Sequence, residues 1–377
     1  MLLSIVIVFL TVIFIIKIQD VKSPLLQKCF NWFPPILFAY MIPALITHTF
    51  NLNLANSEIH IYSKGFIIPL TILSVMSALS LSQLKIVGIK PIVLFVSGSF
   101  IIATLPPILI FLLRLLSPDL GIQIINEELW KGLVTIVGSW IGGSTSQLVL
   151  KEVVECSEEL FAAILVLDNI LVNIWTILMF QFIKRSDQIN NYFGISSEKP
   201  PVSEFEDAPV SKIQSGFTIM IVSLISFSFF FIGISFLSKI ILLSIIGLAL
   251  GNLIKNWDHK IILKVGSKLI LIIMATLGLK LNFYSLGIPS ALVGITLIWL
   301  VLHYLGMMIV SYYLRIHMAW VPIASMANLG GISTAPAVTA AYEKQWMPHA
   351  IVLAILSMVS GTAWGLFTTF LFGLLKP

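Results

Sequence analysis

Long apolar runs recur along the whole chain and are separated by short polar stretches. A helix needs about 20 apolar residues to cross the hydrocarbon core of a bilayer. Because the runs are continuous and do not alternate with polar residues, they predict transmembrane helices and exclude an outer-membrane barrel. We expect ten spanning helices, at about 1–17, 33–50, 66–83, 92–116, 159–184, 215–238, 240–254, 264–281, 288–314 and 347–374.

Two further apolar segments, 128–156 and 317–343, are each interrupted by glycines and hydroxyl residues. The first contains the run IGGSTS at 141–146, and the second contains NLGGISTAP at 328–336. We call these runs the first break and the second break. Irregular backbone at membrane depth is tolerated only where it is buried in protein or lines a cavity. A matched pair of such interruptions is a pointer to the binding site of a transporter.

The spacing of the two breaks indicates an internal duplication. Gly142 and Gly330 lie 188 positions apart, and the motif AILV at 163–166 recurs as AIVL at 350–353 with nearly the same offset. We therefore predict an all-α polytopic membrane protein with two inverted repeats of about five transmembrane helices, each with a glycine-rich re-entrant hairpin or broken helix. The repeats are 1–184 and 215–377. The polar stretch 185–214 between them is interpreted as a flexible cytoplasmic linker without chemistry of its own.

Charge distribution decides between broken segments that cross the membrane and broken segments that dip in and return. Cytoplasmic loops carry an excess of Lys and Arg. With the N-terminus outside and both segments re-entrant, the cytoplasmic loops collect the basic clusters at 17–28, 85–90, 184–212 and 255–264. If both segments crossed, the last two clusters would move outside. The count therefore favours two hairpins that enter from opposite faces.

Composition supports a membrane protein and removes several other classes. The chain of 377 residues is 58% hydrophobic and 10% charged, against about 25% charged in soluble domains. The first run has no basic n-region or cleavage site, so we expect it to be retained as a helix. The net charge of +5 is assigned to cytoplasmic loops and not to nucleic-acid binding. Cys29 and Cys156 have no metal or redox spacing.

The breaks combine conformational freedom with hydrogen-bonding groups. Glycine frees φ and allows close backbone approach, and helix N-termini next to a break favour an anion. The alternative is close helix packing through small residues without a ligand. The residues predicted to bind substrate are Gly142, Gly143, Ser144, Thr145, Ser146, Asn328, Gly330, Gly331, Ser333 and Thr334.

A carboxylate inside an apolar helix marks the predicted coupling site. Asp168 lies well inside the span 159–184, where an ionisable residue costs on the order of 3 kcal/mol. Asn169 and Asn173 are four residues apart and share one helix face. We expect Asp168, Asn169 and Asn173 to bind the coupling ion, either a proton or Na⁺ held at Asp168 and Asn169. The alternative is a polar cluster that joins helices. The matching helix of the second half has serines but no acid.

Residues 142–173 and the second break resemble the bacterial membrane family DUF819, the YjcL-like proteins, over nearly the whole chain. That family resembles the cation:proton antiporter and anion transporter group, which includes sodium/glutamate, 2-hydroxycarboxylate/sodium and bile-acid/sodium symporters. The resemblance implies Na⁺- or H⁺-coupled transport of a small organic anion by an elevator movement of a core against a scaffold. It does not supply the substrate.

We therefore expect a secondary active transporter in the bacterial inner (plasma) membrane, with a channel or a membrane-embedded enzyme as alternatives. The expected partners are a small-molecule substrate, the lipid bilayer and, as an option, a second copy in a homodimer, but no nucleic acid. No cofactor is expected besides the coupling ion, and no ATP-binding motif is present. An enzyme is not expected, because an intramembrane protease needs a Ser–His pair or two aspartates at depth. His303 has no evident serine partner in the sequence.

Overall fold

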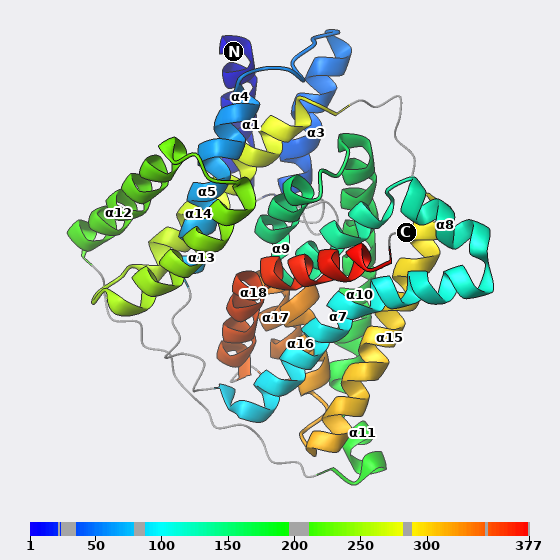
Figure 1. Cartoon of the computed structure of the whole chain (residues 1–377). Coiled ribbons are helices and arrows are strands. Elements are labelled where there is room, and N and C mark those ends of the chain that lie inside the picture. Colours follow the sequence, from blue (N-terminus) through cyan, green and yellow to red (C-terminus); the bar gives the residue numbers. More distant parts are fainter. Residues whose placement is uncertain are drawn as a thin grey trace. The chain divides into compact units, whose positions relative to one another are not determined.

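A computed structural model describes residues 1–21, 23, 35–78, 87–195, 211–281, 289–343 and 346–375. Within these residues the chain is helical and contains no strand (Figure 1). The helices of the N-terminal half are α1 (Leu2–Gln19), α3 (Pro35–Thr49), α4 (Ile59–Tyr62), the π-helix η1 (Ser63–Ile67), α5 (Ile68–Ser77), α7 (Ile89–Leu116), α8 (Pro118–Asn126), α9 (Trp130–Val153) and α10 (Glu158–Lys184). They are followed by α11 (Ser186–Phe193), α12 (Lys212–Phe231), α13 (Phe236–Leu253), α14 (His259–Gly278), α15 (Ser290–Leu314), α16 (Trp320–Leu329), α17 (Gly331–Ala340) and α18 (Met347–Gly373).

Nine helices in the described residues are long and apolar enough to cross a membrane, which indicates a multi-pass membrane protein. The prediction of an all-α chain is confirmed within these residues. Predicted and observed bounds agree closely for α10 and α18. Two predicted spans differ most. The third begins earlier than predicted, because α4, η1 and α5 continue one another from Ile59 onward, and the sixth, predicted at 215–238, is α12, which ends at Phe231. The predicted end of the third span at 83 and the predicted start of the second span at 33 lie outside the described residues.

The chain forms two compact units. The first unit comprises residues 1–79, 157–170 and 209–287. Its core places α5 against α12, α13 and α14, with Leu73, Val222 and Leu243 almost completely buried. Close approach of α13 to α5 needs glycine, since a Cβ at Gly251 would overlap the carbonyl oxygen of Ser77.

The second unit comprises residues 80–156, 171–208 and 288–377. Helix α9 is largely buried in it and packs extensively against α18. The rings of Trp140 and Trp299 are fully buried, with centroids 4.2 Å apart. This unit contains both glycine breaks.

Each unit draws helices from both halves of the sequence. In each half the earlier helices belong to the first unit and the later helices belong to the second. Helix α10 is shared, because its residues 158–170 belong to the first unit and 171–184 to the second. The predicted internal duplication, with one repeat on each side of 185–214, does not follow from these compact units and stays a prediction.

The predicted linker is partly helical. Residues Ser186–Phe193 form α11, which ends at Gly194 in the left-handed conformation (φ 60°). Asn190 in α11 is almost completely buried and accepts a hydrogen bond from the backbone N–H of Met318 at 2.9 Å. The stretch 186–193 is therefore not a flexible tether, because α11 docks on the chain that leads into α16. The interpretation of 185–214 as a connector without chemistry stays a prediction.

Candidate functional site at the two glycine breaks

The first break reverses the direction of the chain inside α9. Gly143 is the one residue of this helix with non-helical backbone angles, φ 66° and ψ −164°. Lys131 Nζ lies 3.4 Å from the carbonyl oxygen of Glu155, although 24 residues of straight helix would separate them by about 36 Å. The arms also touch, since a Cβ at Gly138 would lie 3.0 Å from Cα of Gln147. The chain therefore folds back at Gly143.

The second break has the same effect between α16 and α17. Gly331 has a φ of 63°, which only glycine adopts readily. At the other end of the segment, the hydroxyl of Tyr342 lies 3.1 Å from Nε2 of His317. The rings of Trp320 and Trp346 stack with centroids 5.3 Å apart. The start of α16 and the end of α17 therefore lie side by side.

Both breaks pair a glycine with a hydroxyl four residues later. A Cβ at Gly142 would overlap Oγ of Ser146, and a Cβ at Gly330 would overlap Oγ1 of Thr334. Gly142 also lies against the backbone of Gly361 in α18. The first glycine of each pair therefore provides space, and the second provides the positive φ.

Helix α18 joins the two breaks. The hydroxyl of Ser357 forms hydrogen bonds with the carbonyl oxygen of Ile141 and with Oδ1 of Asn328, the latter at 3.2 Å. Ser99 in α7 donates to the same Oδ1 at 2.9 Å. Thr362 donates to Ser146 at 3.0 Å. The structure thus brings together residues that lie almost 190 positions apart in the sequence.

Four side-chain donors at these breaks are buried without a hydrogen-bond partner among the described residues. They are Thr145 Oγ1, Gln147 Nε2, Asn328 Nδ2 and Thr334 Oγ1. The side chains of Thr145, Gln147 and Asn328 are at most 5% exposed. An unsatisfied buried polar group costs about 1–3 kcal/mol, and native proteins contain few of them. Each of the four can donate a hydrogen bond, so a ligand with acceptor atoms would satisfy them.

The other predicted substrate-binding residues occupy the same region. Gly143 and Ser144 are half-buried in the first break, and Gly331 is half-buried in the second. The backbone of Ser333 lies in α17, and its side chain lies outside the described part of the chain.

The residues predicted for the coupling ion lie on α10. Asp168 is 6% exposed, and Asn169 and Asn173 are half-buried. Asp168 and Asn169 belong to the first unit, whereas Asn173 and both breaks belong to the second. Among the described residues no group of three His, Cys, Asp or Glu side chains could hold a metal ion. A Na⁺ site at Asp168 and Asn169 would rely on one carboxylate with amide oxygens, and it stays a prediction.

His303 corrects one sequence-based expectation. Its side chain is fully buried, and its Nε2 lies 3.2 Å from Oγ of Ser325. The same oxygen accepts a hydrogen bond from Nε1 of Trp175 at 3.0 Å. The expectation that His303 lacks a serine partner is therefore wrong. The spacing of 22 residues carries no motif that would have revealed the pair, and Ser99 was missed for the same reason.

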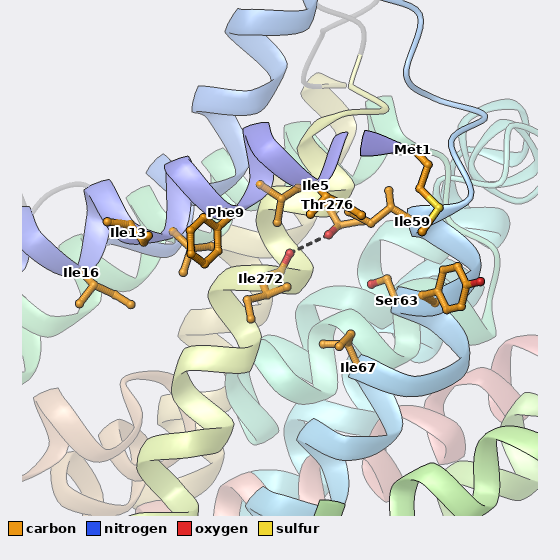
Figure 2. A pocket seen from close by; sticks show the side chains of 13 residues that line it. Met1, Ile5, Phe9, Ile13, Ile16, Ile59, Ser63, Ile67, Ile272 and Thr276 are labelled. Carbon is orange, nitrogen blue, oxygen red and sulfur yellow. Dashed lines mark hydrogen bonds between the residues drawn. The ribbon is translucent and has the colours of Figure 1, made fainter. Parts of the chain in front are cut away.

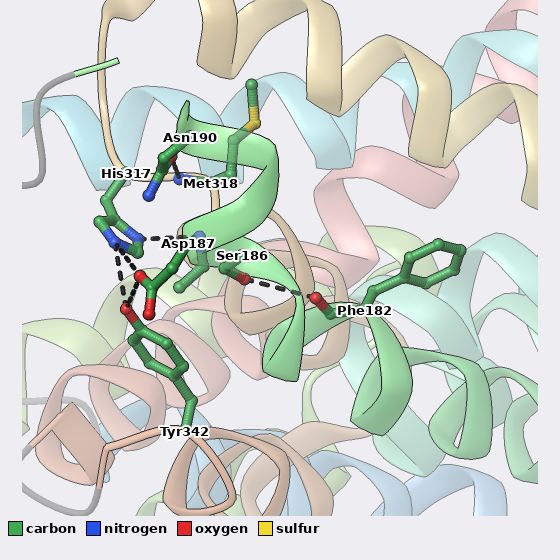
Figure 3. A network of polar contacts seen from close by, with 8 residues as sticks. Phe182, Ser186, Asp187, Asn190, His317, Met318 and Tyr342 are labelled. Carbon is green, nitrogen blue, oxygen red and sulfur yellow. Dashed lines mark hydrogen bonds and ion pairs between the residues drawn. The ribbon is translucent and has the colours of Figure 1, made fainter. Parts of the chain in front are cut away.

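A polar network closes the second break at the end opposite Gly331 (Figure 3). The hydroxyl of Tyr342 donates to Oδ1 of Asp187 in α11 at 2.6 Å, and His317 Nε2 lies 3.2 Å from the same oxygen. The backbone N–H of Ala319 donates to Nδ1 of His317 at 3.2 Å. Burial, followed by the hydrogen bond to Asp187, raises the pKa of Tyr342 well above its ordinary value. Because Nδ1 is an acceptor, the network requires neutral His317 with its proton on Nε2.

The sequence model of a protein family, described as "Protein of unknown function (DUF819)", matches residues 5–374. This chain belongs to the DUF819 family. The resemblance found in the sequence is thereby confirmed at the level of the family. No curated protein matches this DUF819 chain. The family description names no activity, so the chemistry of this DUF819 protein has to be inferred from its own residues.

Proposed function

We propose that this protein is a secondary active transporter that couples the movement of a small organic anion to Na⁺ or H⁺. One observation carries the proposal. Four buried donors without a partner, Thr145, Gln147, Asn328 and Thr334, gather at two helix breaks that share contacts through Ser357. Carboxylate oxygens only accept hydrogen bonds when ionised, so they match this set of donors.

The helix ends at the breaks favour the same class of ligand. Helix α17 begins at Gly331, and the second arm of α9 begins directly after Gly143. The first N–H groups of a helix have no partner within it and carry partial positive charge. Together with the four donors they would stabilise an anion without a lysine or arginine.

We further propose that both broken segments are re-entrant hairpins within inverted repeats. The contact of Lys131 with Glu155 and that of His317 with Tyr342 support this topology, since each holds the two ends of one segment together. If α9 does not cross and the shorter helices α3 and α13 do, the nine candidate spans become ten crossings. This number fits the distribution of basic loops in the sequence.

The composition of the two units supports an elevator mechanism. The second unit contains both breaks together with the last helices of each half, so it has the parts of a substrate-carrying core. The first unit collects the first helices of each half, which suits a scaffold. Asp168 is buried on α10, the helix that both units share. We assign the coupling ion to Asp168, Asn169 and Asn173 on this helix.

Transport by the purified protein in liposomes tests the proposal. We expect uptake of at least one radiolabelled small carboxylate under an inward Na⁺ or H⁺ gradient, and loss of uptake when an ionophore dissipates that gradient. Asn328→Ala removes a buried donor and should reduce uptake about tenfold. Asn252→Ala is the matched control, because Asn252 is exposed on α13 and donates to the carbonyl oxygen of Leu248.

Two results would contradict the proposal. One is the absence of ion-dependent uptake across a broad panel of carboxylates, in protein that thermal unfolding shows to be folded. The other is equal uptake by the Asn328→Ala and Asn252→Ala variants.

A further inference from the structure

The first unit contains an apolar pocket that is separate from the glycine breaks. Its volume is about 470 Å³, within the range of small-molecule sites. We call it the N-terminal pocket; α1, α4, η1 and α14 form its walls (Figure 2). Nine of the thirteen lining side chains are hydrocarbons, and the others belong to Met1, Tyr62, Ser63 and Thr276. Apolar cavities stay dry and bind apolar ligands.

Helix α1 gives the pocket its elongated shape. Its lining residues run from Met1 to Ile16, which corresponds to about 22 Å of helix. Ile5, Phe9 and Ile13 repeat every four residues and therefore lie on one face of α1. Phe9 is 63% exposed and Ile5 is 40% exposed, so the pocket is open on this side. One leaflet of the hydrocarbon core is about 15 Å thick, and an extended acyl chain of that length fits along α1.

One polar group in the wall points to the chemistry of the ligand. Ser63, the first residue of η1, is 5% exposed, and its hydroxyl has no hydrogen-bond partner among the described residues. Figure 2 shows this hydroxyl directed into the pocket. Thr276 also lines the pocket, but its hydroxyl donates to the carbonyl oxygen of Ile272 at 2.9 Å. Most helical Ser and Thr side chains in apolar surroundings bond in this way.

Ser63, whose hydroxyl has no partner among the described residues, is the first residue of a π-helix. Residues Ser63–Ile67 form a π-helix between α4 and α5, and single π-turns are frequent at functional sites. In the following helix, Thr71 donates to the carbonyl oxygen of Ile67 at 2.7 Å. The wider turn therefore coincides with a buried pocket hydroxyl that has no partner among the described residues, whereas the other lining residues with a hydroxyl are the bonded Thr276 and the exposed Tyr62.

We propose that the N-terminal pocket binds one acyl chain of a membrane phospholipid, whose ester carbonyl oxygen accepts a hydrogen bond from Ser63. The apolar wall accounts for the chain, the open side at Phe9 accounts for entry from the bilayer, and the buried hydroxyl accounts for the ester. A sugar, a peptide or a carboxylate substrate would leave several polar atoms against hydrocarbon, which is costly. The site does not depend on the proposed transport activity.

Photo-crosslinking of the full chain in lipid bilayers tests the site. The probe is a phosphatidylethanolamine with a diazirine on one ester-linked acyl chain, and mass spectrometry locates the adducts. We expect adducts on α1, α4–η1 and the end of α14. Ser63→Ala should lower the yield of these adducts about fivefold, the factor that one neutral hydrogen bond contributes. Ile13→Trp, which fills part of the pocket, should lower it with any acyl probe.

Three controls make the result decisive. An ether-linked probe lacks the ester carbonyl, so it should label the native protein and Ser63→Ala equally. Thr276→Val removes the hydroxyl that is already bonded and should leave labelling unchanged, while thermal unfolding verifies that each variant is folded. Adducts spread evenly over all membrane helices, or unchanged labelling in both Ser63→Ala and Ile13→Trp, would overturn the proposal. Competition by free fatty acid but not by phospholipid would also overturn it.

Discussion

The two glycine breaks share a positive φ at their second glycine but differ in what surrounds it. In both, the second glycine has a φ near 65° (Gly143 and Gly331), and a hydroxyl group packs on the first glycine. At the far end, however, the first break is closed by Lys131, whose side chain is 13% exposed and which also bonds the exposed Glu128 at 2.6 Å. The second break is closed by a network of buried His317, half-buried Tyr342 and exposed Asp187. Both breaks thus have a glycine with positive φ at the turn, whereas different side chains hold the two ends of each segment together.

The largest expected effect concerns Asp168, the buried acid inside α10, since α18 in the second half contains no acidic residue. Asp168→Asn keeps the size of the side chain and removes its charge, so coupled uptake in liposomes should fall on the order of 100-fold. Ser357, on the corresponding helix of the second half, has no charge to lose, and Ser357→Ala should reduce uptake less. Folding of both variants can be verified by thermal unfolding. Full ion-dependent uptake by Asp168→Asn would remove the coupling role from this residue.

Alanine at the first glycine should destabilise the protein more in the first break than in the second, because different atoms surround Gly142 and Gly330. Gly142→Ala meets the backbone of Gly361 and should destabilise the protein by about 3 kcal/mol. Gly330→Ala meets only the side chains of Thr334 and Met326 at close range, so about 1 kcal/mol is expected. Thermal unfolding in detergent measures both changes.

A second substitution tests that difference. Thr334→Ala should restore part of the stability lost in Gly330→Ala, because it removes the hydroxyl that overlaps most, while Cε of Met326 stays close. Ser146→Ala should not restore Gly142→Ala, since the backbone of Gly361 remains in place. Restored stability in both double variants would mean that contact with the backbone of Gly361 is not what destabilises Gly142→Ala.

Alanine at the second glycine should affect both breaks alike. Beyond the neighbouring residues of the chain, no atom of the described residues lies within 4 Å of a Cβ built on Gly143 or Gly331, so the expected cost is one of backbone conformation. A positive φ lies in a sparsely populated backbone region, which costs a residue with a Cβ about 1–3 kcal/mol. Equal shifts of the unfolding midpoint in Gly143→Ala and Gly331→Ala are expected. A marked inequality would show that the positive φ at the second glycine does not by itself set the cost.

The smallest effects should come from the two closures. Tyr342→Phe loses the hydrogen bond to Asp187 and should cost about 1 kcal/mol. Lys131→Met removes an ion pair whose carboxylate is 60% exposed and should cost less than about 1 kcal/mol. Equal or reversed losses in thermal unfolding would contradict the view that the network of Tyr342, Asp187 and buried His317 is the stronger closure.

The raised pKa of Tyr342 should also make the stability of the folded protein decline at alkaline pH. The pKa of Tyr342 is raised in the folded state, so the neutral phenol stabilises the fold. That contribution is fully present below the ordinary value of 10.0 and is lost as pH rises above it. Unfolding measured from pH 8 upward should therefore show a shallower alkaline decline in Tyr342→Phe than in the native protein. Identical slopes would contradict the role of the phenol.

The sequence allowed the membrane helices and the positions of both turns to be predicted. Apolar length locates α10 and α18 almost to the residue, and glycine pairs locate Gly143 and Gly331, because both signals are local. Contacts between distant segments carry no such signal. The bond of Ser99 to Asn328 joins residues 229 positions apart. Likewise, α11 was missed because a short polar helix depends on its docking partner and not on an apolar run.

The position of Ser357 has a consequence for how the two breaks influence each other. A hydroxyl group has a single proton, yet this one faces two acceptors, the carbonyl oxygen of Ile141 and Oδ1 of Asn328. It can donate fully to only one of them at a time. Asn328 keeps the bond from Ser99 in either case, so each rotation of Ser357 toward Asn328 releases the carbonyl of Ile141 alone. A single rotating O–H bond thus makes the state of one break depend on that of the other.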